Sequence, residues 1–352
     1  MLYQTMNPHG GDLYGRPVVL DFSANTNPLG TPDAVRQAVI GAVSRLDRYP
    51  DPYCRVLVQA IARFEQVPED YILCGCGAAE LIFSYCMAVR PKHALELAPT
   101  FSEYSTALEA VGCQVDRYSL VSDNGFVLKE SFLSYLEAGE WDALFLCNPN
   151  NPTGQIIERG LLEQIARLCH EKQMRLFLDE CFLDLTDGGR VQSMKEYLNQ
   201  FPGLFILKAF TKSYGMAGLR LGYCLTADPA LLTAMSRAVQ PWNVSIPAQV
   251  AGVAALGETA FLEYTRQIIR EEREWLRQQL SALGITVNPS CANYLLLYCS
   301  TPLQEKLMER GILIRNCANY HSLDEGWYRI AVKTHKENQV LISALTEILE
   351  EH

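Results

Sequence analysis

Residues 142–154 read DALFLCNPNNPTG, and this stretch decides the class of fold. Its first part, residues 142–147, is almost wholly apolar and has the length of one strand, which indicates a strand buried on both faces. Two prolines, three asparagines and a glycine follow directly, and they predict a rigid turn. The next residues, 159–172, have helical periodicity and lead to another apolar run at 175–179. A strand, a helix and a strand in this order indicate an α/β fold.

The same alternation extends through the middle of the chain. Candidate strands occupy residues 71–74, 94–97, 115–118, 142–147, 175–179, 204–208 and 221–225. Candidate helices lie between most of them, at 78–89, 102–111, 159–172 and 228–238. The strands are rich in apolar residues on both faces, so we predict a large α/β domain around a mostly parallel, seven-stranded sheet.

A smaller α/β domain is expected after this sheet. Residues 258–284 form one long helical pattern that ends at a glycine, and we interpret it as a connector between domains. Strands at 293–299, 312–315 and 327–332 and helices at 302–310 and 335–351 follow it. The first 48 residues are rich in proline and glycine and are expected to be irregular and to pack on this C-terminal region. The expected division is an arm (1–48), a large domain (49–257) and a linker helix with a small domain (258–352).

Composition excludes several classes of function. The 352-residue chain has a formal net charge of −10, which argues against a nucleic-acid partner. We recognise neither a secretory signal nor an apolar stretch of bilayer length, so we expect a cytoplasmic protein with no membrane association. The 12 cysteines are scattered, mostly in apolar runs, and are expected to be reduced. The Cys74–Cys76 pair lacks a second pair at ligand spacing, so we predict no metal site.

Four segments fall at ends of the predicted strands, where open α/β sheets bind ligands. The first is residues 75–80, GCGAAE, whose small residues open a helix and suit a phosphate, although a plain tight turn is an equal alternative. The second is the turn 148–154, in which Asn151 presents an amide. The third is Asp179, a buried acid that is costly unless it is paired, with a helix N-cap or a salt bridge as the alternative.

The fourth segment carries the amine. Lys212 follows the strand at 204–208, with Thr211 before it and Arg220 eight residues further on. A single lysine is usually a solvated surface charge, but lysine is also the amine that forms Schiff bases with carbonyl compounds. Together the four segments supply a phosphate cradle, a partner for a ring oxygen, an acid for a pyridinium nitrogen and an amine for an aldehyde. These are the groups that hold pyridoxal 5'-phosphate (PLP), so we predict a PLP-dependent enzyme with Lys212 as its catalytic lysine.

At this point the chain resembles the class II aminotransferases of PLP fold type I, and within them the histidinol-phosphate aminotransferase group. The resemblance spans essentially the whole chain. Inside that group the chain looks most like the L-threonine-O-3-phosphate decarboxylases of cobalamin biosynthesis. The motifs that carry the resemblance are residues 9–11 (HGG), 21–30 (DFSANTNPLG), 48–50 (RYP), 148–154 (NPNNPTG), 218–223 (GLRLGY) and 314–320 (IRNCANY).

The resemblance implies a role for each of several residues. The PLP phosphate would be bound by the backbone of Ala78 and Ala79, by Thr211 and Arg220, and by Tyr49 of a second subunit in a homodimer. Phe101 would stack on the ring, Asn151 would bond its hydroxyl, and Asp179 its nitrogen. Arg329 looks like the arginine that binds the substrate carboxylate. The substrate's carboxylate or phosphate end would be held by His9, Asn25 and Arg315.

Three positions depart from the family's usual pattern. Ala209 stands where Ser or Thr is usual, which removes one phosphate contact. Phe182 replaces the tyrosine that is typical of the aminotransferases, and the decarboxylases tend to have phenylalanine there. Cys76 stands where Asn is frequent.

The resemblance implies PLP-dependent decarboxylation of L-threonine O-3-phosphate, a small phosphorylated amino acid, to (R)-1-amino-2-propanol O-2-phosphate and CO2. The alternative is an aminotransferase of the histidinol-phosphate type, which uses the same cofactor residues. A non-catalytic sensor with a PLP fold is a third hypothesis, disfavoured because no basic DNA-binding segment precedes residue 48.

Overall fold

The computed structural model describes residues 9–14 and 17–350. Its main element is a seven-stranded sheet with the order β2-β8-β7-β6-β5-β3-β4. The strands are β2 (Ile72–Gly75), β3 (His93–Ala98), β4 (Gln114–Ser119), β5 (Ala143–Cys147), β6 (Arg175–Asp179), β7 (Leu204–Ala209) and β8 (Gly222–Leu225). β8 is antiparallel to both of its neighbours, and the other strand pairs are parallel. The predicted α/β class and the mostly parallel sheet are confirmed.

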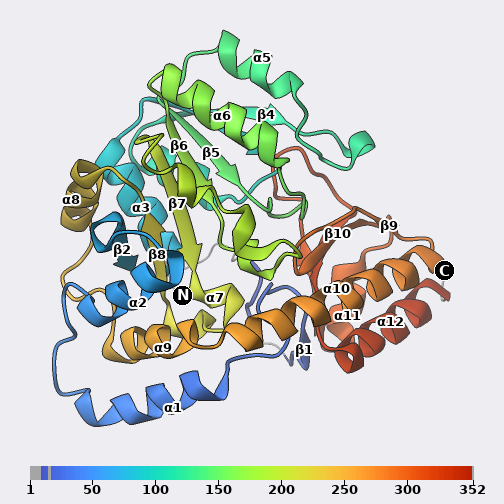
Figure 1. Cartoon of the computed structure of the whole chain (residues 1–352). Coiled ribbons are helices and arrows are strands. Elements are labelled where there is room, and N and C mark those ends of the chain that lie inside the picture. Colours follow the sequence, from blue (N-terminus) through green and yellow to red (C-terminus); the bar gives the residue numbers. More distant parts are fainter. Residues whose placement is uncertain (1–8, 15–16, 351–352) are drawn as a thin grey trace.

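Helices cover both faces of this sheet (Figure 1). The core on one face contains residues of α3 (Gly77–Val89), α4 (Glu103–Ala110) and α8 (Pro229–Ala238). The core on the other face contains residues of α2 (Arg55–Glu65), α6 (Arg159–Glu171) and α9 (Ile246–Leu256). Side chains alternate between faces along each strand, so the apolar runs supply both cores at once.

An aromatic row shows how the register builds the first of these cores. Phe145, Phe177 and Phe205 lie side by side on β5, β6 and β7. Their ring centroids are 4.6 Å and 4.9 Å apart. The edge of the Tyr85 ring, from α3, packs against this row. Such aromatic contacts stabilise the sheet beyond simple burial and hold its strands in one alignment.

The C-terminal part of the chain forms a second sheet, with the order β12-β13-β10-β9 and antiparallel pairs. Its strands are β9 (Thr286–Val287), β10 (Tyr294–Tyr298), β12 (Arg315–Asn316) and β13 (Trp327–Ala331). The long α10 (Thr259–Ala282) leads into this region, which also contains α11 (Leu303–Glu309) and α12 (His335–Glu350). These elements share a hydrophobic core of their own, separate from those of the large sheet.

The prediction of a single strand at 312–315 is wrong. The chain divides it into β11 (Ile312–Leu313) and β12, which belong to different sheets. β11 pairs in parallel with β1 (Leu20–Asp21) from the beginning of the chain, whereas Arg315 pairs with β13. The division arises because an N-terminal segment occupies the edge of residues 312–313.

The expectation that residues 1–48 are irregular is also corrected. Residues 33–42 form α1 (Asp33–Ala42), which lies along α9 beneath the large sheet (Figure 1). β1 pairs with β11 of the C-terminal region, and α1 packs along α9; the packing of the arm as a whole on that region stays a prediction. The helix follows Pro32 and has Asp33 in its first turn, both of which favour a helix start. The domain boundaries at 48/49 and 257/258 stay predictions.

Among the helices of the described residues, none is both long and apolar enough to cross a membrane.

Candidate active site

The strand ends of the large sheet border a cavity of about 350 Å³. β2, β5, β6 and β7 end there, and β8 begins there because it runs in the opposite direction. We call it the inner cavity. The predicted site residues that line it are His9, Asn25, Ala78, Ala79, Phe101, Asn151, Asp179, Thr211, Lys212, Arg220, Arg315 and Arg329. Its volume suits a small cofactor together with a small substrate.

One end of the inner cavity is built to hold an anion. The N-terminus of α3 begins at Gly77, which has a φ of +82° and lies against the Arg220 guanidinium. A Cβ on Gly77 would be 2.6 Å from Nη2 of Arg220, and a Cβ on Gly222 would be 2.9 Å from the Ala78 nitrogen. The two glycines therefore allow a helix N-terminus and a guanidinium to meet, an arrangement that binds phosphate.

A buried carboxylate lies deeper in the same cavity. Asp179 ends β6 and accepts hydrogen bonds from the Tyr104 hydroxyl, at 2.6 Å, and from the Cys181 backbone N–H, at 2.8 Å. Both donors are neutral, and burial raises the pKa of Asp179 above its usual value. A cationic ring nitrogen beside Asp179 would stabilise its ionised form, so this environment fits a pyridinium.

Lys212 is carried by α7 (Phe210–Ser213), the short helix directly after β7. Its Nζ lies 5.5 Å from the centre of the Phe182 ring. Burial lowers the pKa of Lys212 to about 8, and the positive charges of Arg329 and Arg220 act in the same direction. A lower pKa provides more of the neutral amine, which is the nucleophilic form.

Two arginines reach the cavity from the C-terminal sheet. Arg329 is only 6% exposed and donates to the Asn151 side-chain oxygen and, at 2.9 Å, to the carbonyl of Ser23. Arg315 donates to Oδ1 of Asn319 at 2.6 Å. The buried Nε of Arg329 has no hydrogen-bond partner among the described residues. It is therefore available to an anionic group, and the oxygen of Asn151 is oriented by Arg329.

Asn25 adds a second unsatisfied polar atom. Its side chain is buried, and its Oδ1 has no hydrogen-bond partner within the part of the chain that the structure describes. Buried polar atoms normally have partners. An unsatisfied amide oxygen and an unsatisfied guanidinium nitrogen in one cavity indicate that a bound molecule supplies their partners.

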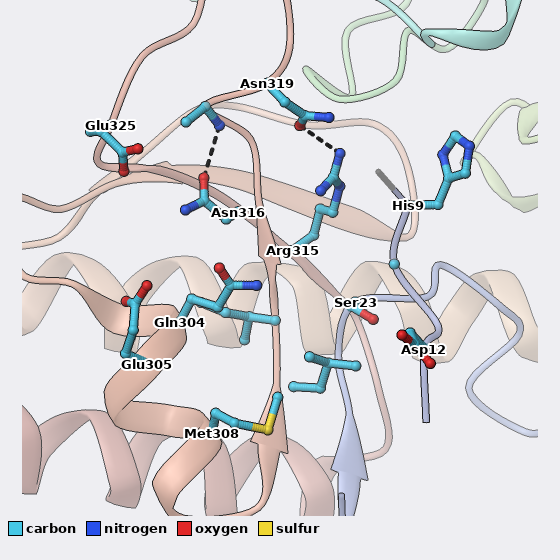
Figure 2. A pocket seen from close by; sticks show the side chains of 14 residues that line it. His9, Asp12, Ser23, Gln304, Glu305, Met308, Arg315, Asn316, Asn319 and Glu325 are labelled. Atoms are coloured by element: carbon cyan, nitrogen blue, oxygen red, sulfur yellow. Dashed lines mark hydrogen bonds between the residues drawn. The ribbon is translucent and has the colours of Figure 1, made fainter. Parts of the chain in front are cut away.

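A larger cavity of about 870 Å³ opens beside the inner one (Figure 2). We call it the outer cavity, and it shares His9, Gly10, Ser23 and Arg315 with the inner cavity. Figure 2 shows His9 and Arg315 among the side chains that line the outer cavity, with the Arg315–Asn319 hydrogen bond. An imidazole and a guanidinium therefore both lie where the two cavities meet.

Tyr49 lies outside the inner cavity of its own chain. It is 78% exposed, and its ring stacks on Trp242 with the centroids 4.5 Å apart. Leu46, Tyr53 and Val56 nearby are exposed as well. An exposed aromatic and aliphatic group of this kind is typical of a protein–protein interface.

The opposite face of the sheet holds a set of buried charges directly behind the site. Nζ of Lys208, which is 1% exposed, lies 3.1 Å from Glu180 and 3.4 Å from Asp184. Glu65, which is fully buried, pairs with Lys195 at 2.8 Å. Buried ions of this kind are stable only while their partners remain in place.

Sequence reasoning missed several residues that line the inner cavity. Glu103 and Tyr104 fall within the helix predicted at 102–111 and have no predicted role, but Tyr104 donates a hydrogen bond to Asp179 and Glu103 pairs with His9. Tyr320 also lines the cavity and accepts a hydrogen bond from Arg329 at 3.4 Å. The available signal was position alone, because Glu103 and Tyr104 follow a predicted ring-stacking residue, Phe101, by two and three places.

Comparisons with known proteins agree in the kind of protein they find. A model of aminotransferase class I and II matches residues 17–345. The chain is 40% identical to the threonine-phosphate decarboxylase of Salmonella typhimurium, over 97% of this chain and 96% of the other. It is 29% identical to the histidinol-phosphate aminotransferase of Methanosphaera stadtmanae, over 94% and 91%. The histidinol-phosphate aminotransferase of Clostridium acetobutylicum superimposes with a TM-score of 0.88 at 27% identity, over 95% and 100%.

Proposed function

Because the chain belongs to the class I and II aminotransferase family, we propose that it removes the carboxyl group of L-threonine O-3-phosphate with the help of PLP. The products are CO2 and (R)-1-amino-2-propanol O-2-phosphate. The observation that carries this proposal is the 40% identity to a threonine-phosphate decarboxylase, which extends over 97% of the chain.

The inner cavity would hold PLP with the residues expected from the sequence. The backbone N–H groups of Ala78 and Ala79, with Thr211 and Arg220, would bind its phosphate, and Lys212 its aldehyde carbon. The remaining contacts would be made by Phe101 with the face of the ring, Asn151 with its hydroxyl and Asp179 with its nitrogen. When bound, PLP withdraws electrons from the substrate's Cα, so that one bond to Cα becomes easy to break.

The protein's own residues decide which bond breaks by orienting the substrate. The bond that lies perpendicular to the ring plane is the one weakened, and the substrate is held there through its charged ends. Arg329 would bind the carboxylate, and His9, Asn25 and Arg315 would bind the phosphate end. The proton that replaces CO2 at Cα would come from the Lys212 ammonium, whose pKa of about 8 permits proton transfer near neutral pH.

The charges at the substrate end support a substrate with two anionic groups. Arg315 and Arg329 both line the inner cavity, and His9 and Arg315 both line its junction with the outer cavity. L-Threonine O-3-phosphate carries a carboxylate and a phosphate, which match these groups. Phe182 supports the same choice, because the resemblance associates phenylalanine at this position with the decarboxylases.

Transamination of histidinol phosphate with 2-oxoglutarate is the second candidate function. The similarity to two histidinol-phosphate aminotransferases favours it, one by sequence and one by structure. All of the proposed PLP contacts serve either reaction.

A homodimer with shared active sites is part of the proposal. Tyr49 would reach the PLP phosphate of the other subunit, which is consistent with its exposure outside its own cavity. We also propose that the reaction serves cobalamin biosynthesis, as the resemblance implies. A cytoplasmic location stays a prediction.

A substrate comparison tests the function. The PLP-loaded enzyme is incubated with O-phospho-L-threonine, and separately with histidinol phosphate and 2-oxoglutarate. We expect CO2 and the amino-alcohol phosphate from the first mixture, formed without any keto acid. Amino transfer without CO2 release would reject the decarboxylase and support the alternative, and Lys212→Ala is the inactive control for both.

A further inference from the structure

Glu103 is an acidic residue in a cavity built for anions. It is the first residue of α4, its side chain is 18% exposed, and it lines the inner cavity. Its Oε1 lies 2.9 Å from Nε2 of His9. The contact joins the beginning of the chain to a helix of the large sheet, next to the proposed PLP ring partner Phe101, whose ring centre is 6.0 Å from that of His9.

The segment that carries His9 is also held on its other side. A Cβ on Gly10 would lie 2.4 Å from the carbonyl oxygen of Ser23, so a larger residue would displace the segment. The backbone N–H of Gly11 donates to Oγ of Ser23 at 2.7 Å. The Ser23 carbonyl in turn accepts from Arg329 at 2.9 Å. His9 is therefore fixed between Glu103 on one side and the Ser23–Arg329 contact on the other.

Glu103 is a negative charge among the mostly positive side chains that line the inner cavity. Among the described residues that line it, two are carboxylates, Asp179 and Glu103. Asp179 has its proposed place at the PLP nitrogen. A second carboxylate among Lys212, Arg220, Arg315 and Arg329 lowers the affinity for anionic substrates by repulsion, unless it contributes in another way.

Its contribution is the orientation of the imidazole. A carboxylate that binds one ring nitrogen of a histidine fixes the direction in which the ring faces. His9 and Arg315 both line the junction of the inner and outer cavities. The bond to Glu103 therefore restricts the directions in which the His9 imidazole, which is 38% exposed, can face.

We propose that Glu103 is a positioning residue that holds His9 beside Arg315, and that it thereby sets the enzyme's preference for phosphorylated over unphosphorylated amino acids. The inference rests on the proposed function in one respect, since it takes the group bound at His9 and Arg315 to be the substrate's phosphate.

The test compares three variants of the PLP-loaded enzyme. Glu103→Gln removes the charge, Glu103→Asp keeps the charge on a shorter side chain, and Glu109→Gln is the control on the same helix, with a side chain that is 64% exposed. KM and kcat are measured for O-phospho-L-threonine and for L-threonine, and PLP affinity by absorbance titration. We expect Glu103→Gln to raise KM for the phosphorylated substrate about 10-fold, the equivalent of one charge-assisted hydrogen bond. In the same variant, kcat, KM for L-threonine and PLP affinity should stay within about twofold of the parent values. Glu103→Asp should have a smaller rise in KM for the phosphorylated substrate, and Glu109→Gln should match the parent enzyme.

Three results would overturn the inference. They are an unchanged KM in Glu103→Gln, an equal rise in KM for L-threonine, and a parallel loss of PLP affinity that shows general damage to the site. The dissociation constant of O-phospho-L-threonine, read from the change in PLP absorbance, separates this inference from the reaction itself. If that constant follows the expected pattern while no CO2 forms, the positioning role is supported and the decarboxylase is rejected.

Discussion

Arg315 and Arg329 lie directly opposite one another in the antiparallel pair of β12 and β13. Opposed residues of such a pair project from the same face of the sheet, so two positive charges share one small surface. The arrangement is unfavourable alone and becomes favourable when an anion lies between the two guanidinium groups.

Anions should therefore stabilise the enzyme at this pair. In the PLP-loaded enzyme, where the cofactor's own phosphate occupies the cradle at Ala78 and Arg220, inorganic phosphate should raise the unfolding temperature by roughly 2–4 °C at saturation. Arg315→Gln should remove most of this rise, whereas Arg36→Gln, which changes an exposed side chain of α1, should retain it. An undiminished rise in Arg315→Gln would place the anion elsewhere. Differential scanning fluorimetry is the measurement.

The capture of PLP by the cofactor-free protein should accelerate as the pH rises through about 8. Burial lowers the pKa of Lys212 to about 8, and the neutral amine that reacts accumulates above that value. Arg329 also lowers this pKa, so Arg329→Gln should move the midpoint to higher pH. Stopped-flow absorbance at a series of pH values gives both midpoints. A rate that keeps rising to pH 10 in the parent protein would contradict the depressed pKa.

Loss of the Asp179 carboxylate should be far more damaging than loss of its hydroxyl donor. Asp179→Asn removes the negative charge beside the ring nitrogen, and we expect kcat to fall at least ~100-fold. Tyr104→Phe removes one hydrogen bond of 2.6 Å and should lower kcat by about 2- to 10-fold. Tyr85→Phe is the matched control, because the buried Tyr85 hydroxyl has no hydrogen-bond partner among the described residues. Steady-state kinetics with saturating PLP give the kcat of each variant, and we expect the lowest value for Asp179→Asn and the highest for Tyr85→Phe.

Complementation between two inactive variants tests whether Tyr49 acts across a dimer. Lys212→Ala and Tyr49→Ala subunits are mixed, dissociated and reassociated. Half of the dimers should then be hybrids with one complete site, so activity should return to about a quarter of the parent level. The absence of any recovery, with hybrids verified by native mass spectrometry, would mean that Tyr49 acts within its own chain, and full activity of Tyr49→Ala alone would mean that it has no role at the site.

Glu96 should make the protein less stable as the pH rises. It is 2% exposed, and burial raises its pKa from 4.5 to about 7, despite the opposing charge of Arg117 at 2.9 Å. The folded state holds the proton more tightly than the unfolded chain, so this stabilisation is complete below pH 4.5 and is lost as the pH passes 7. The effect is on the order of 1–3 kcal/mol. Glu96→Gln should flatten urea-unfolding stability between pH 5 and 8, and an unchanged slope would show that Glu96 is ionised throughout.

The sequence predicts the large sheet well because its strands are apolar on both faces. Each of the seven candidate strands lies within one residue of an observed strand at both ends, and Phe145, Phe177 and Phe205 are in register. The direction of β8 could not be read from its composition, yet it brings Arg220 to the same edge as Asp179. The division between β11 and β12 depends on pairing with Leu20–Asp21, nearly 300 residues earlier, which local patterns do not contain.

Site residues that belong to sequence motifs could be predicted. Site residues that depend on the direction of a side chain in the folded structure could not. Asn151, Asp179, Lys212 and Arg220 all line one cavity, as their positions at strand ends suggested. Tyr104 was missed because helical periodicity places it in the core without showing that its hydroxyl reaches Asp179.

The charges buried behind the site restrict how this protein can change over time. Lys208 lies on β7, the strand that leads directly into the helix of Lys212. Its partner Glu180 follows Asp179 directly, and its partner Asp184 lies in the segment after it. Replacement of any one of them leaves a buried charge without its partner, whereas a joint replacement by apolar residues can be tolerated. We therefore expect these three positions to covary among descendants of this sequence. Substitutions on this face of the sheet would then occur together at the three positions, even where the residues of the inner cavity stay the same.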